Sequence, residues 1–134
     1  MFNIERFDHV GLRVTNLQTA QSFYEKLGFR ADPGEESPRG TARGLVNDGG
    51  VRIHLIYNGV PRRDGVNVLM DVPIKRAGYT HAAFIIDDLD ELVAWLEAEG
   101  IPITEGPSIY GHGRRKVCFI RDPDRNVLEF NQIL

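Results

Sequence analysis

Three histidines and one glutamate stand at positions that could together hold a metal ion. His9 and His81 are related by an offset of 72 in the numbering, and His54 aligns with Glu129 at an offset of 75. Imidazole nitrogens and a carboxylate oxygen form a mixed site that suits a divalent transition metal. Taken singly, a strand histidine is more often a hydrogen-bonded structural residue, and a lone glutamate is usually solvated. Four such residues at duplicated positions favour the metal site.

Two segments with the same order of elements must position these residues. In each half the pattern predicts a strand, a helix and three further strands. The first helix follows the cap Thr15-Asn16 and ends at Gly28, and the second follows Asp87-Asp88 and ends at Gly100. The strands are expected at about 4–14, 29–31, 41–46 and 51–57, then at 79–86, 101–104, 114–120 and 126–133, with loops at Asp32–Gly40 and Glu105–Gly113 and a connector at Asn58–Gly78.

The spacing indicates an internal duplication. Phe23 and Trp95, which lie in the two predicted helices, share the offset that relates His9 to His81, as do the two helix-ending glycines. A repeat of this size with matching element order is strong evidence for the fold. We therefore expect a single domain over 1–134, with module one at about 4–58, a connector at 59–78 and module two at about 79–133.

Strand periodicity turns the candidate ligands away from the apolar core. His9 is out of phase with Val10 and Leu12, and the other three candidates are likewise out of phase with their apolar neighbours. Alternation sends the apolar side chains to a helix-covered face and the polar ones to the opposite face. If the halves pair about a pseudo-twofold axis, the four polar side chains can converge.

Composition excludes several classes of protein. The 134 residues carry 16 Lys and Arg against 19 Asp and Glu, so the net charge is −3 and capture of nucleic acid or an anionic membrane is disfavoured. No apolar stretch approaches the length of a membrane span, and the first residues lack a signal-peptide layout. The single cysteine, Cys118, excludes an intramolecular disulfide and suits a reducing compartment. We therefore expect a soluble cytoplasmic protein without a nucleic-acid or membrane partner.

The chain resembles the vicinal oxygen chelate superfamily, which includes glyoxalase I, extradiol dioxygenases and the bleomycin resistance proteins. The resemblance rests on three motifs and on the duplicated element order: Phe7-Asp8-His9-Val10-Gly11-Leu12, Tyr79-Thr80-His81-Ala82-Ala83-Phe84 and Arg121-Asp122-Pro123-Asp124-Arg125-Asn126-Val127-Leu128-Glu129-Phe130. It implies an α+β fold in which two paired βαβββ modules form a cupped eight-stranded mixed sheet with helices on the outer face. It also implies a homodimer and a divalent transition metal (Fe, Mn, Ni, Co or Zn) held by His9, His81 and Glu129, with His54 at the fourth position.

Histidine at position 54 stands where glyoxalase I usually has a glutamate that is both ligand and base. Two roles for His54 therefore stay open. As a fourth ligand it leaves about two coordination sites for a substrate with neighbouring oxygens. If it stays uncoordinated, dioxygenase chemistry is permitted and His54 becomes a candidate general base.

These features predict a small metal-dependent enzyme that uses the metal as a Lewis acid on a bidentate, oxygen-bearing metabolite. Glyoxalase-like lyase or isomerase chemistry and extradiol-type dioxygenase chemistry both remain open, and the alternative is a ligand-sequestering protein of the bleomycin-resistance type that lacks enzymatic activity. His112 is a second catalytic candidate, with a flexible surface loop as its ordinary interpretation. Three further residues are candidates for orienting an anionic substrate: Tyr57, Arg114 and Arg115.

Overall fold

The computed structural model describes all residues from 1 to 134, which divide into two units, 1–61 and 62–134. Unit one contains, in order, β1 (Val10–Arg13), α1 (Leu17–Lys26), β2 (Arg30–Glu36), β3 (Ala42–Val46) and β4 (Arg52–Ile56). Unit two contains the short 3-10 helix η1 (Arg63–Gly65), β5 (His81–Ile85), α2 (Leu89–Glu99), β6 (Ile103–Tyr110), β7 (Arg115–Arg121) and β8 (Val127–Ile133). The predicted βαβββ order and the α+β class are therefore confirmed. No helix is long and apolar enough to cross a membrane.

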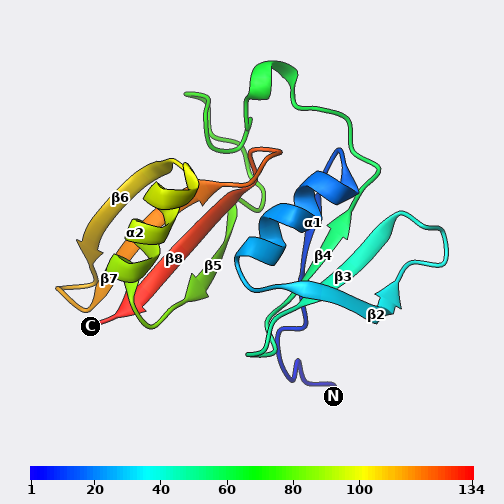
Figure 1. The fold of residues 1–134 in the computed structure, drawn as a ribbon, viewed down its shortest axis with the longest axis horizontal. Coiled ribbons are helices and arrows are strands. Elements are labelled where there is room, and N and C mark those ends of the chain that lie inside the picture. The colour runs from blue at the N-terminus through cyan, green and yellow to red at the C-terminus, as the bar shows by residue number, and fades with distance from the viewer. The chain divides into compact units, whose positions relative to one another are not determined.

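Unit one is a four-stranded mixed sheet with one helix packed on it. The strand order is β1-β4-β3-β2, with β1 parallel to β4 and the other neighbours antiparallel. The helix begins where the Asn16 side chain accepts a hydrogen bond from the Thr19 amide at 2.9 Å, as predicted. Its buried residues are Ala20 and Tyr24. Figure 1 shows α1 lying over the sheet of this unit.

Unit two repeats this arrangement with the order β5-β8-β7-β6. Asp88 caps α2 by accepting from the Glu91 amide at 3.0 Å, and Gly100 ends the helix in the left-handed conformation with a φ of 69°. Only glycine adopts that conformation without steric cost. Leu89 and Leu96 of α2 are completely buried. Figure 1 shows α2 lying over the sheet of this unit.

The strand register reproduces both predicted offsets. Val10 pairs with Ile53 in unit one, and Ala82 pairs with Leu128 in unit two. Val10 and Ala82 are related by the offset of His9 and His81, and Ile53 and Leu128 by the offset of His54 and Glu129. His54 and Glu129 therefore occupy equivalent positions in the two sheets.

The first strand is shorter than predicted. The pattern predicts its start at residue 4, but it begins at Val10, and His9 lies immediately before it. Val10 pairs with Ile53, and β4 itself begins at Arg52, so residues 4–8 would extend beyond the start of β4 and have no strand to pair with. The predicted strand at 79–86 is shortened for the same reason, because His81 already pairs with Val127, the first residue of β8.

The outer strands are longer than predicted. β2 runs into the expected loop Asp32–Gly40, and β6 runs into the expected loop Glu105–Gly113. Each strand carries a proline–glycine pair at a shift of register, between Ala31 and Glu36 in β2 and between Glu105 and Ser108 in β6. Both lie at a sheet edge, where a bulge and a missing amide donor are tolerated.

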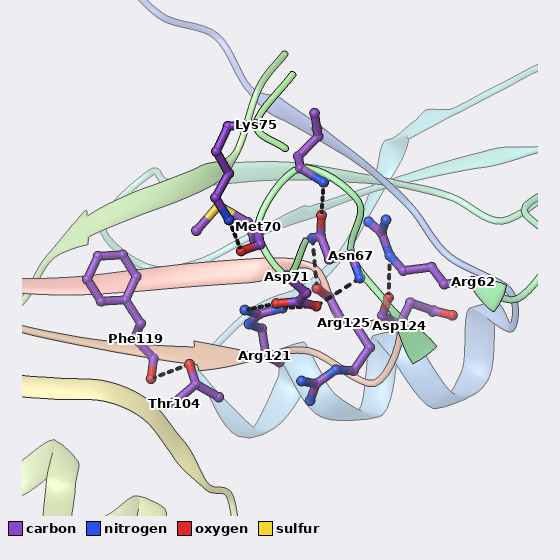
Figure 2. A network of polar contacts seen from close by, with 11 residues as sticks. Arg62, Asn67, Met70, Asp71, Lys75, Thr104, Phe119, Arg121, Asp124 and Arg125 are labelled. Carbon is purple, nitrogen blue, oxygen red and sulfur yellow. Dashed lines mark hydrogen bonds and ion pairs between the residues drawn. The ribbon is translucent and has the colours of Figure 1, made fainter. Parts of the chain in front are cut away.

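The connector, whose sequence has little pattern, is held against the turn between β7 and β8. Figure 2 shows Arg62 donating to the carbonyl of Asp124 at 3.0 Å, and its second hydrogen bond reaches Oδ1 of Asn126 at 3.1 Å. Asn67 is only 3% exposed and donates to the carbonyl of Arg125 at 3.1 Å. These hydrogen bonds explain why most of the connector belongs to unit two.

Candidate functional site

Unit one brings His9 and His54 into direct contact. Their rings stack with centroids 3.6 Å apart and planes inclined by 15°. His54 lies in the middle of β4 between the completely buried Ile53 and Leu55, so alternation turns it to the sheet face opposite α1. Its strand partner is Gly11, which lies two positions after His9, and this register places both imidazoles on that face.

The two imidazoles have different surroundings. Nδ1 of His9 lies 2.6 Å from a carboxylate oxygen of Asp8, and this hydrogen bond lowers the pKa of Asp8. Nε2 of His54 is buried and has no hydrogen-bond partner. Burial, and then the charge of a protonated His9, lower the pKa of His54. His54 is therefore neutral at pH 7, with its buried Nε2 unsatisfied.

A carboxylate approaches His54 because residue 44 is a glycine. Gly44 pairs with His54 across the sheet, and a Cβ at position 44 would overlap the Cβ of Glu35. The Glu35 carboxylate lies 3.8 Å from Nε2 of His54 and forms an ion pair with Arg52 at 2.8 Å. Sequence reasoning placed Glu35 in a loop and missed it, since its position depends on the bulge in β2.

Unit two brings His81 and Glu129 together. Nε2 of His81 lies 3.4 Å from Oε1 of Glu129. Two donor atoms bound at about 2.1 Å to one metal lie about 3.0 to 3.4 Å apart in octahedral or tetrahedral geometry. Phe119 pairs with Glu129 across the sheet, and its ring meets His81 edge to face with centroids 5.4 Å apart. The spacing of the two donor atoms is therefore one that a shared metal could use.

The outward-facing atoms of this second pair are held by neighbours. Thr80 Oγ1 lies 2.8 Å from Nδ1 of His81, and the Asn131 amide donates to Oε2 of Glu129 at 2.9 Å. Arg115, predicted to bind substrate, donates to Oδ1 of Asn131 at 3.3 Å. Sequence reasoning overlooked Thr80 and Asn131, although chain position could have found them. Thr80 directly precedes His81, as Asp8 precedes His9, and Asn131 is two positions from Glu129 and so faces the same side of β8.

A further ion pair lies on the same sheet face. Arg121 pairs with Val127, which in turn pairs with His81, so the three residues form one row across the sheet. Both terminal nitrogens of Arg121 contact the Asp71 carboxylate, at 2.8 and 3.2 Å (Figure 2). This contact with Arg121 is the main cause of the lowered pKa of Asp71. Neither residue was singled out from the sequence, because Asp71 comes from the connector.

Three of the remaining candidates lie apart from these pairs within their units, and the fourth, Arg115, is linked to Glu129 only through Asn131. His112 is exposed at the tip of the turn between β6 and β7, with a φ of 57°, and Arg114 is exposed beside it. Arg115, where β7 starts, pairs with Ile133, which is four positions along β8 from Glu129, or about 13 Å. Tyr57 follows the end of β4, and its hydroxyl lies near Gly40. His112, Arg114 and Tyr57 are thus not among the side chains gathered around either pair.

The four candidate ligands supply three imidazoles and one carboxylate, the donors that suit Fe, Mn, Ni, Co or Zn. A metal bound at Nε2 of His54 would satisfy a buried atom that otherwise lacks a partner. The donor set and this orphaned atom fit a divalent transition metal. No group of three or more His, Cys, Asp or Glu side chains is arranged to hold a metal ion.

One curated relative matches most of this chain but less than half of its own length. Lactoylglutathione lyase of Schizosaccharomyces pombe is 26% identical over 135 residues, which cover 92% of this chain and 44% of that protein. The chain therefore spans less than half the length of this relative.

Solved structures match the chain over almost its full length. A protein from the mobile metagenome of V. pseudocholerae is 29% identical with a TM-score of 0.68, and the match covers 98% of this chain and 97% of that one. A glyoxalase/dioxygenase from Nostoc punctiforme has a TM-score of 0.75 at 22% identity, covers 98% and 93% of the two chains, and shows the fold alone. The family match extends over residues 6–130, so the chain belongs to the Glyoxalase/Bleomycin resistance protein/Dioxygenase superfamily.

Proposed function

We propose that the protein is a divalent-metal-dependent enzyme in which His9, His54, His81 and Glu129 bind one metal ion. The observation that carries this proposal is the duplicated register: each sheet bears a histidine where its first strand begins, just before β1 or at the first residue of β5, and a second donor at the equivalent position of its last strand. This register gives each unit two polar donors on the sheet face opposite its helix.

The state of the donors supports metal binding. Imidazoles bind metals only when neutral, and the lowered pKa of His54 keeps its ring neutral at pH 7. Glu129 supplies a negative charge, which offsets part of the charge of a divalent ion. When bound, such an ion supplies Lewis-acid stabilisation of negative charge that develops on a substrate oxygen.

We further propose that the substrate is a small metabolite with two neighbouring oxygens, and that lyase or isomerase chemistry is the first activity to test. The printed name of the curated relative, lactoylglutathione lyase, supports this choice. The alternative role of His54, as an uncoordinated base, also has support, because a neutral imidazole accepts a proton and the Glu35 carboxylate stabilises the resulting charge. Ring cleavage by a dioxygenase is the competing reaction within the same superfamily.

Metal content tests this proposal directly. Protein purified without chelator should carry close to one equivalent of a transition metal, or bind one on titration with Fe(II), Mn(II), Ni(II), Co(II) or Zn(II). His81→Ala should lose the metal, while His112→Ala, which removes the histidine outside the two pairs, should keep it. Wild-type protein that neither contains nor binds metal would contradict the proposal and favour a ligand-sequestering protein.

Activity is then measured on the metal-loaded protein. The hemithioacetal of methylglyoxal and glutathione tests lyase and isomerase chemistry, and catechols under oxygen test ring cleavage. Turnover of the hemithioacetal that disappears in His81→Ala is the expected result. Turnover of catechols alone would assign the dioxygenase reaction instead.

A further inference from the structure

Three of the four candidate ligands have one polar atom held by a neighbour in their own unit. The first is His9, whose Nδ1 lies 2.6 Å from Asp8 Oδ2. An ionised carboxylate only accepts hydrogen bonds, so in this contact Nδ1 of His9 carries the hydrogen. This contact fixes the neutral ring in the tautomer that has its lone pair on Nε2.

His81 has a neighbour at the equivalent position, Thr80, which restricts the imidazole ring less than Asp8 restricts that of His9. Thr80 occupies the position before His81 that Asp8 occupies before His9, and its hydroxyl lies 2.8 Å from Nδ1. A hydroxyl both donates and accepts, so Thr80 holds the ring orientation but leaves the tautomer free. A metal at Nε2 requires Nδ1 to donate, and the Thr80 oxygen can accept that bond.

Glu129 is held through a short chain of side chains. Arg115 donates to Oδ1 of Asn131 at 3.3 Å, which turns the amide nitrogen of Asn131 toward Glu129. That nitrogen donates to Oε2 of Glu129 at 2.9 Å. The other carboxylate oxygen, Oε1, is the one that lies 3.4 Å from Nε2 of His81.

We propose that Asp8, Thr80 and Asn131 are positioning residues that determine which atoms of His9, His81 and Glu129 face the metal. The inference rests on the proposed function. Ligands whose outer atoms are hydrogen-bonded keep their orientation before the metal arrives, so binding costs less side-chain entropy. His54 differs from these three ligands, since its ring stacks on His9 and its buried Nε2 has no hydrogen-bond partner.

The role of Asp8 can be tested on the metal-free, full-length protein. Long-range ¹H–¹⁵N spectra at about pH 8, above the ordinary histidine pKa of about 6.5, report the tautomer of each ring. His9 should carry its hydrogen on Nδ1 in the wild type and shift toward the Nε2-H form in Asp8→Ala. The same tautomer in both proteins would overturn the assignment to Asp8.

Metal affinity tests the positioning set as a whole. Asp8→Ala and Asn131→Ala should each weaken Co(II) or Zn(II) binding about 10- to 100-fold. Thr80→Val should also weaken it, and Thr80→Ser, which restores the hydroxyl, should recover it. Glu5→Gln is the matched control for Asp8, since it removes one negative charge from the same segment and should leave the affinity unchanged.

The outcomes separate this inference from the proposed function. Wild-type affinity in Asp8→Ala and Asn131→Ala, with a folded structure by circular dichroism, would overturn the positioning role while leaving the metal site intact. Wild-type protein that binds no metal would overturn the metal site and the positioning role together. In that case a change of the His9 tautomer in Asp8→Ala would show that Asp8 fixes the His9 ring, without any role in metal binding.

Discussion

The two units have the same strand register but carry different side chains at equivalent positions. In unit one, His54 stacks on His9 and faces a glycine across the sheet. In unit two, the equivalent of His54 is Glu129, which lies beside His81 and faces Phe119. Gly44 and Phe119 are related by the same offset as His54 and Glu129. The glycine of unit one and the phenylalanine of unit two therefore occupy equivalent positions.

This difference shows how a repeated scaffold can hold two unlike half-sites. A protonated histidine and an ionised carboxylate attract each other. Two stacked imidazoles repel each other when both are protonated, and burial with this repulsion lowers the pKa of His54. Unit two thus offers a pair whose outer atoms are fixed, and unit one offers one fixed imidazole and one unsatisfied imidazole.

Removing a ligand from unit two should have the largest effect. Glu129→Ala should weaken metal binding by at least about 100-fold, because it deletes the only carboxylate donor and leaves His81 without its neighbour. Isothermal titration with Zn(II) or Co(II) measures the change. A loss no greater than that of Asn131→Ala would mean that Glu129 is not a ligand.

The glycine of unit one can be tested by adding a methyl group. Gly44→Ala should lower the free energy of unfolding by about 1 to 3 kcal/mol, since the new Cβ overlaps Glu35 in the neighbouring strand. Urea unfolding measures the difference. Gly34→Ala in β2 is the matched control, because its Cβ would meet only the Asp32 side chain at 3.7 Å. Equal stability of the two variants would contradict this account of Gly44.

The unsatisfied imidazole of unit one should matter less for metal binding than the carboxylate of unit two. His54→Ala should weaken Zn(II) affinity only about tenfold, because His54 is a neutral donor whose buried Nε2 no hydrogen bond holds, whereas Glu129 supplies a negative charge. The same titration measures it. A loss as large as that of Glu129→Ala would show that the two units contribute equally.

The smallest expected effect concerns the connector of unit two. Asp71 has a folded pKa below its ordinary value of 3.8, so its ion pair with Arg121 stabilises the fold above that value and is lost as the pH falls through the folded pKa. Asp71→Asn should therefore lower the free energy of unfolding at pH 7 by less than about 1 kcal/mol, and the difference should vanish in strong acid. Denaturant unfolding at several pH values measures this.

Unit one offers the control for this prediction. Asp48 forms an ion pair with Arg30 at 2.7 Å, and its side chain is 99% exposed. Asp48→Asn should change stability less than Asp71→Asn at neutral pH, because solvent screens an exposed pair. The reverse order would mean that the connector is held by contacts other than Asp71.

Sequence reasoning succeeded where the signal is local. The caps at Asn16 and Asp88 and the stop at Gly100 are set by side chains or backbone freedom at those residues, and the structure confirms all three. The equivalence of His54 and Glu129 also followed from spacing, and the strand register bears out that equivalence. Their joint role as metal ligands stays a prediction.

It failed where neighbours distant in the chain decide the outcome. Pro33 and Pro107 indicated loops, but both lie in edge strands that tolerate a missing amide donor. Glu35 reaches His54 only because Gly44 leaves room for it, and Asp71 reaches Arg121 only because the connector packs on unit two. No pattern within either segment encodes such contacts.

The bulge in β2 has a consequence for how this fold can diversify. Glu36 follows Ala31 by five positions in β2, while their partners in β3, Arg43 and Leu45, are only two positions apart, so the bulge takes up the excess chain. An insertion or deletion of a single amino acid there would change which side chain lies beside His54 without moving the core strand that carries it. Evolution can therefore alter the surroundings of this imidazole through chain length at a sheet margin, at little risk to folding.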